Sequence, residues 1–456
     1  MSTPPSAAAP PLSPDGPPKG ALSAIFLIVL VDFLGFGLII PLLPFYVPDW
    51  ETSPLKVTLI FSIFSICQFV GAPVLGALSD RYGRRPVLIV SQIGSAIGYV
   101  ILALAATPAF NFSPEVRLGL VYLSRIIDGF SGGNVSTAQA YISDVTDAKT
   151  RSKGMGLIGA AFGIGFCVGP FLGGVLGAVN PTWPAYAAAL LAALAAFQTW
   201  ARLPEPKVLR KTEAEHWLHP STFGAVLKKP IVAQLILISF VSMAAFVMME
   251  ATSGIYLADK LGWGANAENR IKADQEAARN TGWFFAYAGL VIVIVQGGLI
   301  RRLTKRGLAA EWAMAIVGPV LVAVGMAFFV LLAYTPMMWV LLMAGGVNAL
   351  GRSLQGPTLS SLLSKYSDPR EQGVVFGMYH GLSSLARVFG PLIAGLAYTA
   401  HASHAGQFVV AGVMVLLVAA WTVMVKAKAP AIEQPTGAFA VVQSEAQAQA
   451  ARTEVE

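Results

Sequence analysis

The chain has 456 residues, of which 55% are hydrophobic and only 12% are charged. Its mean hydropathy is +0.65 and its isoelectric point is near 9.3. A soluble domain carries about a quarter charged residues, so this composition excludes an ordinary soluble protein and predicts a polytopic membrane protein. The excess of basic over acidic residues would suggest an acidic partner in a soluble protein. In a membrane protein it is explained by the Lys and Arg residues that gather in the loops on the cytoplasmic side.

Two cysteines, Cys67 and Cys167, both fall in apolar stretches and predict neither a disulfide framework nor a metal cluster. The sequence has no phosphate-binding loop, no metal-ligand spacing and no basic surface interleaved with aromatic residues. We therefore expect no metal, no cofactor, no nucleic-acid partner and no enzymatic activity.

Residues 1–19 are mostly Pro, Ala and Ser and predict a disordered tail. A signal peptide is not expected, because the positively charged N-terminal region of such a peptide is missing and the apolar run that follows is too long. Apolar runs near the ~20 residues that cross a bilayer as a helix then predict an all-α protein. We expect twelve spans, at residues 21–47, 55–78, 86–106, 117–141, 154–178, 182–202, 230–257, 280–300, 311–334, 337–362, 373–398 and 405–425.

A polar segment at 203–229 divides these spans into two six-helix bundles, 20–202 and 230–426, and a second low-complexity tail follows at 427–456. Most of the 31 Lys and Arg residues fall in loops on the same side as the two tails. By the positive-inside bias, both termini are expected to be cytoplasmic in a cell membrane, inner or plasma.

The first span contains Asp32, followed by Pro41 and Pro44. Placing a charged side chain near the bilayer centre costs about 2.5–3.5 kcal/mol. Each charged residue inside a predicted span therefore indicates either a charge partner or a role in transport. A carboxyl group in an apolar site can load and release a proton as water access changes. We assign proton coupling first to Asp32, with Arg125 as its expected partner.

The spans at 55–78 and 86–106 are joined by a short basic turn, Gly76–Pro86. Gly76 is expected to let two backbones approach, Gly83 to take a positive φ, and Pro86 to lie in the first turn of the next helix. Asp80 can bind a helix N-terminus or an arginine in one conformation and release it in another. We assign a conformational gate to Gly76, Asp80, Arg81, Gly83, Arg84 and Arg85.

The span at 117–141 carries a polar stripe. At 100° per residue, six small or polar residues fall within about 60° of Arg125, namely Asp128, Gly129, Gly132, Ser136, Gln139 and Ser143. Such a stripe on an apolar helix predicts a water-filled cavity, and the second half carries similar stripes. We expect the cavity to be lined by Phe36, Gln68, Gln139, Phe246, Asn348, Arg352, Gln355, His380 and Arg387.

Glu250 is the second candidate for proton coupling, or alternatively a binder of cationic substrate. For Asp128, a structural ion pair and a functional role remain equally open. The glycines of the span 154–178 predict close helix packing, and Pro170 predicts a bend. We assign a hinge to Gly165, Gly169, Pro170, Gly173 and Gly174.

The two halves repeat. One shift of 221 residues carries Gly76 to Gly297, Gly169-Pro170 to Gly390-Pro391, Asp147 to Asp368 and Gly156 to Gly377. Several landmarks that obey one offset indicate duplication. Two halves related by an axis along the membrane normal, with a site between them near the midplane, form a transporter arrangement.

Four segments resemble motifs of the major facilitator superfamily. Gly76–Arg85 is similar to its loop between helices 2 and 3, G-x-L-[AS]-D-R-x-G-R-[RK]. Asp32–Pro44 resembles the helix 1 pattern of its twelve-helix drug:proton antiporters. Arg125–Gly129 resembles a helix 4 motif linked to proton coupling, and Gly165–Gly174 a helix 5 motif of exporting antiporters.

This resemblance, strongest to the tetracycline-efflux type, implies a monomeric secondary transporter. It implies that small organic or drug-like compounds leave in exchange for protons, by alternating access. The chain departs from that type at Gly98, where a helix 3 acid is missing, and in helix 9, which has no acid beyond Glu311. Tetracycline as substrate is therefore not implied.

Two alternatives remain open. One is a metabolite or sugar-type symporter or uniporter of the same fold, against which the helix 5 motif counts. The other is a non-transporting membrane receptor or scaffold, which gives no reason for paired interior charges.

Overall fold

The computed structural model describes residues 20–47, 54–146, 148–206, 224, 228–268, 270–304, 306–367 and 372–430. These residues form helices and short connections, with no strand among them. The predicted N-terminal tail lies outside the described residues, as do residues 207–223 of the predicted linker and 431–456 of the predicted C-terminal tail.

The first half of the chain forms six helical rods. They are α1 (Ala21–Ile39) with η1 (Ile40–Tyr46), α2 (Pro54–Tyr82), α3 (Arg84–Ala106), α4 (Pro114–Ser131) with η3 (Gly132–Asn134) and α5 (Val135–Val145), α6 (Ala148–Val179) and α7 (Trp183–Arg202). A short turn, η2 (Pro108–Phe110), lies between α3 and α4.

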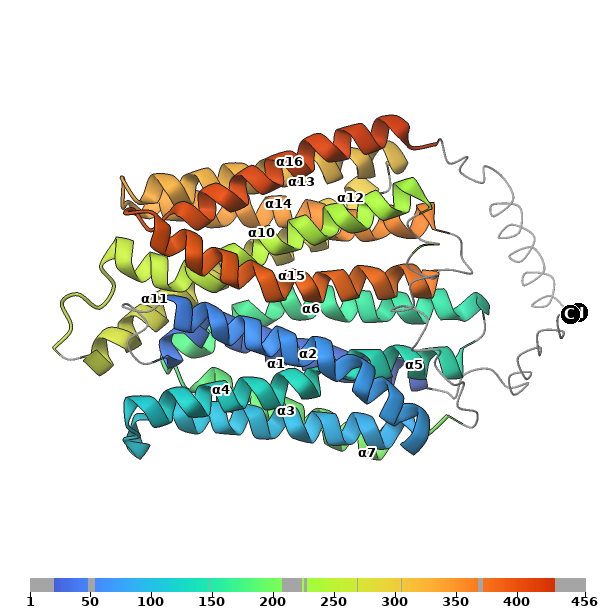
Figure 1. Cartoon of the computed structure of the whole chain (residues 1–456), viewed down its shortest axis with the longest axis horizontal. Helices are drawn as coiled ribbons and strands as arrows, with labels where there is room; N and C mark the ends of the chain where they lie inside the picture. Colours follow the sequence, from blue (N-terminus) through green and yellow to red (C-terminus); the bar gives the residue numbers. More distant parts are fainter. Residues whose placement is uncertain are drawn as a thin grey trace, which may run out of the picture.

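The second half forms six more. They are α10 (Pro230–Leu261), α11 (Arg270–Ile294) with η4 (Val295–Ile300) and α12 (Arg301–Thr304), α13 (Leu308–Leu332), α14 (Met338–Tyr366), α15 (Gln372–Ala400) and α16 (Gly406–Lys428). The offset of 221 residues that the sequence predicted brings each rod of the first half onto a rod of the second half. In Figure 1 the two halves of the chain occupy different halves of the body.

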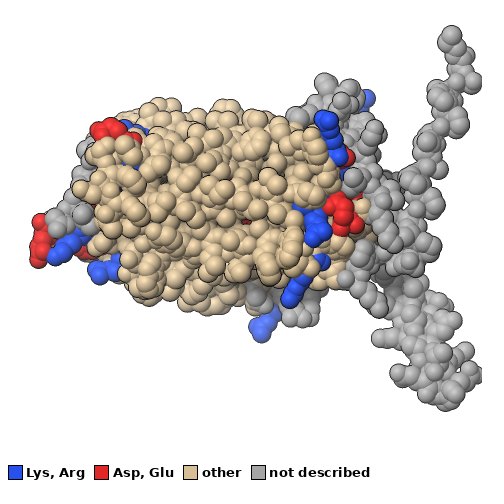
Figure 2. Space-filling view, turned by 90° about the horizontal axis from the view of Figure 1, so that it is seen from below, with Lys and Arg blue, Asp and Glu red and all other residues tan. Residues whose placement is uncertain are grey.

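Nine helices in the described parts of the chain are long and apolar enough to cross a membrane. The other three rods are α4 with α5, α6, and α14, which carry the polar or glycine-rich stretches. Figure 2 shows charged side chains at the two ends of the body and an uncharged band between them on the visible face. The chain is an all-α membrane protein of twelve transmembrane helices in two pseudo-symmetric bundles.

Three predicted spans differ in detail from the observed rods. The first changes into a 3₁₀ helix at Ile40, where Pro41 and Pro44 cannot continue the α-helical hydrogen bonding. The fourth is not continuous but is broken at η3 (Gly132–Asn134). The eighth begins at Arg270 rather than at residue 280, so the connection predicted between the seventh and eighth spans is shorter, and Arg270, Lys272 and Arg279 lie on α11.

The body has two ends, which we call the α2–α3 end, at residues 80–86, and the η1 end, opposite to it. At the η1 end one hydrophobic core joins both halves, since η1 and the start of α2 pack in it together with parts of α10, α11 and α14. At the α2–α3 end the described residues form separate cores, one in each half. Among the described residues, the halves are thus joined by a common apolar core at the η1 end, while the cores at the other end each stay within one half.

The glycines of α6 pack this helix closely against α1, as their four-residue spacing predicts. A Cβ added at Gly169 would lie 2.7 Å from the Cα of Gly37 on α1, and one at Gly173 would collide with the carbonyl of Leu38. Gly174 faces the other way, because a Cβ there would collide with the carbonyl oxygen of Gly282 on α11. Gly174 is therefore where α6 meets the second half backbone to backbone.

Gly174→Ala is expected to lower the free energy of unfolding by about 1–3 kcal/mol, because α6 and α11 must separate to admit the methyl group. Gly119→Ala on α4 is the matched control, since a Cβ at Gly119 meets nothing within 4 Å. The control should be neutral or slightly stabilising, as expected for alanine in a helix. Denaturation in detergent measures both, and equal stability of the two variants would contradict a close crossing at Gly174.

Candidate functional site

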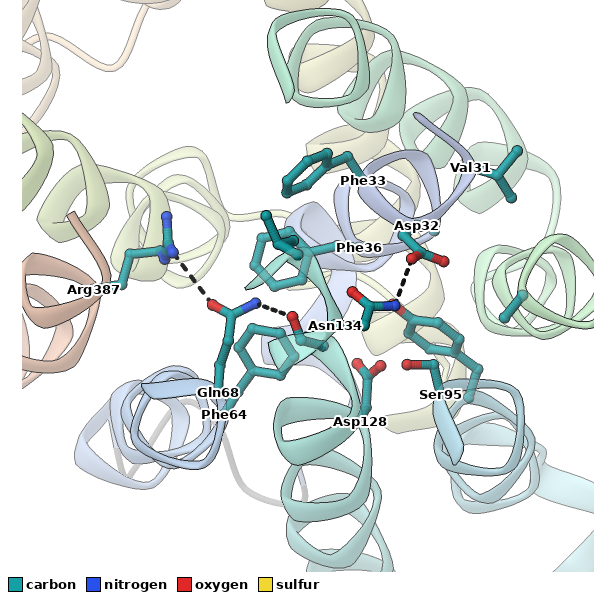
Figure 3. A pocket seen from close by; sticks show the side chains of 15 residues that line it. Val31, Asp32, Phe33, Phe36, Phe64, Gln68, Ser95, Asp128, Asn134 and Arg387 are labelled. Atoms are coloured by element: carbon teal, nitrogen blue, oxygen red, sulfur yellow. Dashed lines mark hydrogen bonds between the residues drawn. The ribbon is translucent and has the colours of Figure 1, made fainter. Parts of the chain in front are cut away.

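A cavity lies where the first bundle faces α15. It holds about 560 Å³ of empty space, including the part that opens to the surroundings. Its lining comes from α1, α2, α3, the broken fourth rod and α7, with one residue from the second half. Figure 3 shows the polar members, Asp32, Gln68, Ser95, Asp128, Asn134 and Arg387, around the aromatic rings of Phe36 and Phe64.

Asp32 on α1 is half-buried at this cavity. Its Oδ2 accepts a hydrogen bond of 2.7 Å from Nδ2 of Asn134, the last residue of η3 (Figure 3). The group that holds the Asp32 carboxylate is thus a neutral amide at the cavity wall.

The break at η3 arises from sequence and from packing. Glycine is a poor helix former, and Gly132 and Gly133 are adjacent. The backbone of α2 lies so close that a Cβ at Gly133 would be 2.5 Å from the nitrogen of Ala72. Gln68 on α2 donates from Nε2 to the Gly132 carbonyl at 3.1 Å, which satisfies one group that the break exposes.

Arg125 on α4 pairs with Asp128 and not with Asp32, the partner that we expected. Nη1 of Arg125 lies 3.1 Å from Oδ2 of Asp128, and both side chains are buried. The guanidinium also lies over the rings of Tyr99, at 5.5 Å, and Phe64, at 5.9 Å. The two residues are three apart on one helix, a spacing at which side chains meet.

Gly98 on α3 packs directly against this ion pair. A Cβ added at Gly98 would lie 3.0 Å from the Cβ of Asp128 and 3.0 Å from the Ser124 carbonyl oxygen. No acidic side chain fits at this position in the observed packing. The acid nearest to it is Asp128 of the neighbouring helix.

In the second half, α15 contributes Arg387 to the cavity. Its Nη2 donates to Oε1 of Gln68 at 3.2 Å and to Oγ of Ser384 at 2.9 Å. Arg352 on α14 lies over the ring of Phe246, 3.9 Å from its centroid. Glu250 on α10 is buried and lies within electrostatic reach of both arginines.

Several predicted cavity residues do not line this cavity. Gln355 donates to Oγ of Ser242 at 2.8 Å and joins α14 to α10, and Asn348 is buried against Gly325 on α13. His380 stacks edge-on against Tyr379, 5.1 Å away. The remaining predicted cavity residues outside this lining are Gln139, Phe246 and Arg352. Of the residues predicted for proton coupling, Asp32 lines the cavity, while Arg125 and Glu250 do not.

The predicted gate is compact at the α2–α3 end. Gly83 has a φ of +100°, as predicted, but Gly76 is not crowded, because a Cβ there would meet only Ser136 Oγ at 3.7 Å. Arg84 is fully buried, forms an ion pair with Asp80, and donates from Nε to Asp144 at 2.7 Å. Glu205 caps α3 by accepting from the backbone nitrogens of Arg84 and Arg85, at 2.6 and 2.9 Å.

Asn134, Ser95 and Tyr99 also line the cavity and are not among the cavity residues predicted from the sequence. On an unbroken helix Asn134 would lie about 180° from Arg125, so the polar stripe excluded it. The pair of glycines before it was the signal that the register changes there. Within the described residues, no three His, Cys, Asp or Glu side chains gather as metal ligands would.

Comparisons with known proteins agree with this architecture. The family model described as Major Facilitator Superfamily matches residues 25–377 and 310–454. The "Tetracycline resistance protein, class C" of Escherichia coli is 32% identical over 396 residues, which cover 84% of this chain and 91% of that protein.

Solved structures resemble the fold over most of its length. The "human organic anion transporter MFSD10 (TETRAN)" is 26% identical with a TM-score of 0.61, covering 89% of this chain and 99% of that one. The nucleoside transporter NupG (D323A mutant) is 14% identical with a TM-score of 0.64, covering 89% of this chain and 99% of that one, and it shows likeness of fold alone. These relatives and neighbours are transporters and not enzymes.

Proposed function

The chain belongs to the Major Facilitator Superfamily, and from that premise we propose that it exports small organic, drug-like compounds in exchange for protons. The observation that carries the proposal is the half-buried Asp32, which lines a cavity of the first bundle beside the ion pair of Arg125 and Asp128, with Arg387 of the second half at its edge. Kinship with a tetracycline resistance protein supports export, and likeness to an organic anion transporter supports an organic substrate.

In the proposed mechanism the two bundles rock about the cavity. With the α2–α3 end on the cytoplasmic side, the apolar core at the η1 end closes the outer side and substrate enters from the cytoplasm. A proton taken up by Asp32 on the outward-open side returns inward with the carrier. Arg125, paired with Asp128, lies beside this proton site, and Glu250 is the second candidate proton carrier, in the other half. The helix α6, with its glycines and Pro170, serves as the hinge.

The energetics allow this exchange. One elementary charge crossing 100 mV is worth about 2.3 kcal/mol. A potential of roughly 150 mV then supports a substrate gradient of about two to three powers of ten. We propose that the protein works as a monomer in the cell membrane with both termini cytoplasmic, which the repeat structure permits because the cavity is formed within one chain.

The experiment is proton flux in reconstituted vesicles that contain a pH-sensitive dye, measured when a compound is added. Antiport predicts proton movement opposite to the compound. A symporter, the second candidate, gives flux in the same direction, and a uniporter or a non-transporting protein gives none. The compounds for this assay are chosen by a susceptibility screen, in which a panel of organic compounds is tested on cells that express the gene and on cells that lack it.

Asp80→Asn is expected to slow turnover by about tenfold, since a hydrogen bond to a charged group is worth about 1.5 kcal/mol. The reason is that Asp80 pairs with the buried Arg84 in the structure closed at the η1 end, and losing this pair alters the balance of conformations. Substrate binding should remain. Initial rates and equilibrium binding in the same vesicles measure both, and weaker binding with unchanged turnover would remove Asp80 from the gate.

A further inference from the structure

A chain of hydrogen bonds connects the second half to the proton site of the first. Arg387 on α15 donates to Oε1 of Gln68, and Nε2 of Gln68 donates to the carbonyl of Gly132 in η3. Asn134, two residues further in the same short turn, holds Asp32. Figure 3 shows Gln68 between Arg387 and the broken helix, with Asn134 and Asp32 on the other side.

The net charge of the interior residues differs in sign between the two halves. In the first half Asp32 and Asp128 outnumber Arg125, and in the second half Arg352 and Arg387 outnumber Glu250. Glu250 lies within reach of both arginines and can balance one of them. One guanidinium charge on the second side is therefore left without a carboxylate in the described part of the bundle.

Arg387 has the open donor positions. Its present partners, Gln68 and Ser384, are neutral, and its Nε is shielded from solvent without a hydrogen-bond partner. Guanidinium groups bind carboxylates and related anions at two points, more strongly than they bind a neutral amide. Arg352 keeps its side chain against the ring of Phe246, which gives the same region an aromatic surface.

We propose that Arg387 binds an anionic group of the substrate, a carboxylate or sulfonate on an aromatic compound, in place of Gln68. The inference rests on the proposed function and names its substrate class. When the anion occupies Arg387, the amide of Gln68 is released, and η3 with Asn134 and Asp32 loses its connection to α15. Occupation of the substrate site is thereby transmitted to the proton site through one side chain.

The test compares two dyes with the same ring system and opposite charge, fluorescein and rhodamine 123. Their binding to the full chain in nanodiscs, without any gradient, is measured by fluorescence anisotropy. Fluorescein should bind more tightly than rhodamine 123. Arg387→Gln should weaken fluorescein binding about 10- to 100-fold, the loss expected for charge-assisted hydrogen bonds, and leave rhodamine 123 unaffected.

Four further variants sharpen the result. Glu250→Gln should strengthen fluorescein binding, because it removes the competing carboxylate. Arg279→Gln, which removes the same charge from an exposed position on α11, should change nothing. Gln68→Leu should bind fluorescein at least as tightly as the parent but move fewer protons per dye. If Arg387→Gln does not fold, Arg387→Lys keeps the charge and should show a smaller loss.

The anion site is overturned if rhodamine 123 binds as tightly as fluorescein or more tightly. It is also overturned if Arg387→Gln binds fluorescein as tightly as the parent does. The flux assay separates this failure from failure of antiport. If rhodamine 123 alone drives proton movement, export in exchange for protons stands and the anion site does not. If fluorescein binds through Arg387 and neither dye moves protons, the anion site stands and antiport does not.

Discussion

Asp32→Asn is expected to abolish proton-driven export, by roughly two orders of magnitude or more, the usual contribution of a positioned group that transfers a proton. Asparagine keeps the size of the side chain and can still bond to Asn134, so the helix packing around η3 should survive. It cannot take up a proton at any pH of the assay. Uptake of a labelled compound into inverted vesicles under an imposed pH gradient measures the loss.

Two controls accompany Asp32→Asn. Exchange of labelled for unlabelled compound without a gradient should persist, because it needs the conformational change but no net proton movement. Glu268→Gln removes an exposed acid near the η1 end and should transport like the parent. Undiminished gradient-driven export by Asp32→Asn would take proton coupling away from Asp32.

Much of the fold could be predicted because membrane crossing leaves few options. A helix must satisfy its own backbone in lipid, so an apolar run of sufficient length specifies a rod. The offset of 221 residues then organised the rods into two related halves. Local backbone requirements were also readable, as the positive φ of Gly83 and the close approach of Gly169 to Gly37 show.

The pairing of interior charges was not readable, because it depends on where helices break and how closely they pack. Asn134 reaches Asp32 only because η3 interrupts the fourth rod. Arg125 meets Asp128 on its own helix, a pairing that their spacing of three residues allows, whereas the expected partner Asp32 is taken by Asn134. The copy of this segment in α14 is continuous, so the repeat could not predict the break either.

Replacing Arg125 by leucine is expected to destabilise the protein by about 3–5 kcal/mol, because it leaves Asp128 buried without its cation. The loss should be larger than that of any other variant considered, since both members of the pair are almost completely shielded from solvent. The free energy of unfolding in detergent measures it. A cost below about 1 kcal/mol, the value of an exposed pair, would contradict the buried pairing.

The double variant Arg125→Leu with Asp128→Asn decides whether this pair is only structural. Removing both charges should restore most of the stability, because no uncompensated charge remains in the interior. We expect export to stay lost, because the pair lies beside the cavity that Asp32 lines. In the proposed mechanism, protonation of Asp32 weakens this neighbouring ion pair, and the double variant has no ion pair there. Recovery of export together with stability would assign Arg125 and Asp128 to packing alone and leave Asp32 and the second half to couple transport to protons.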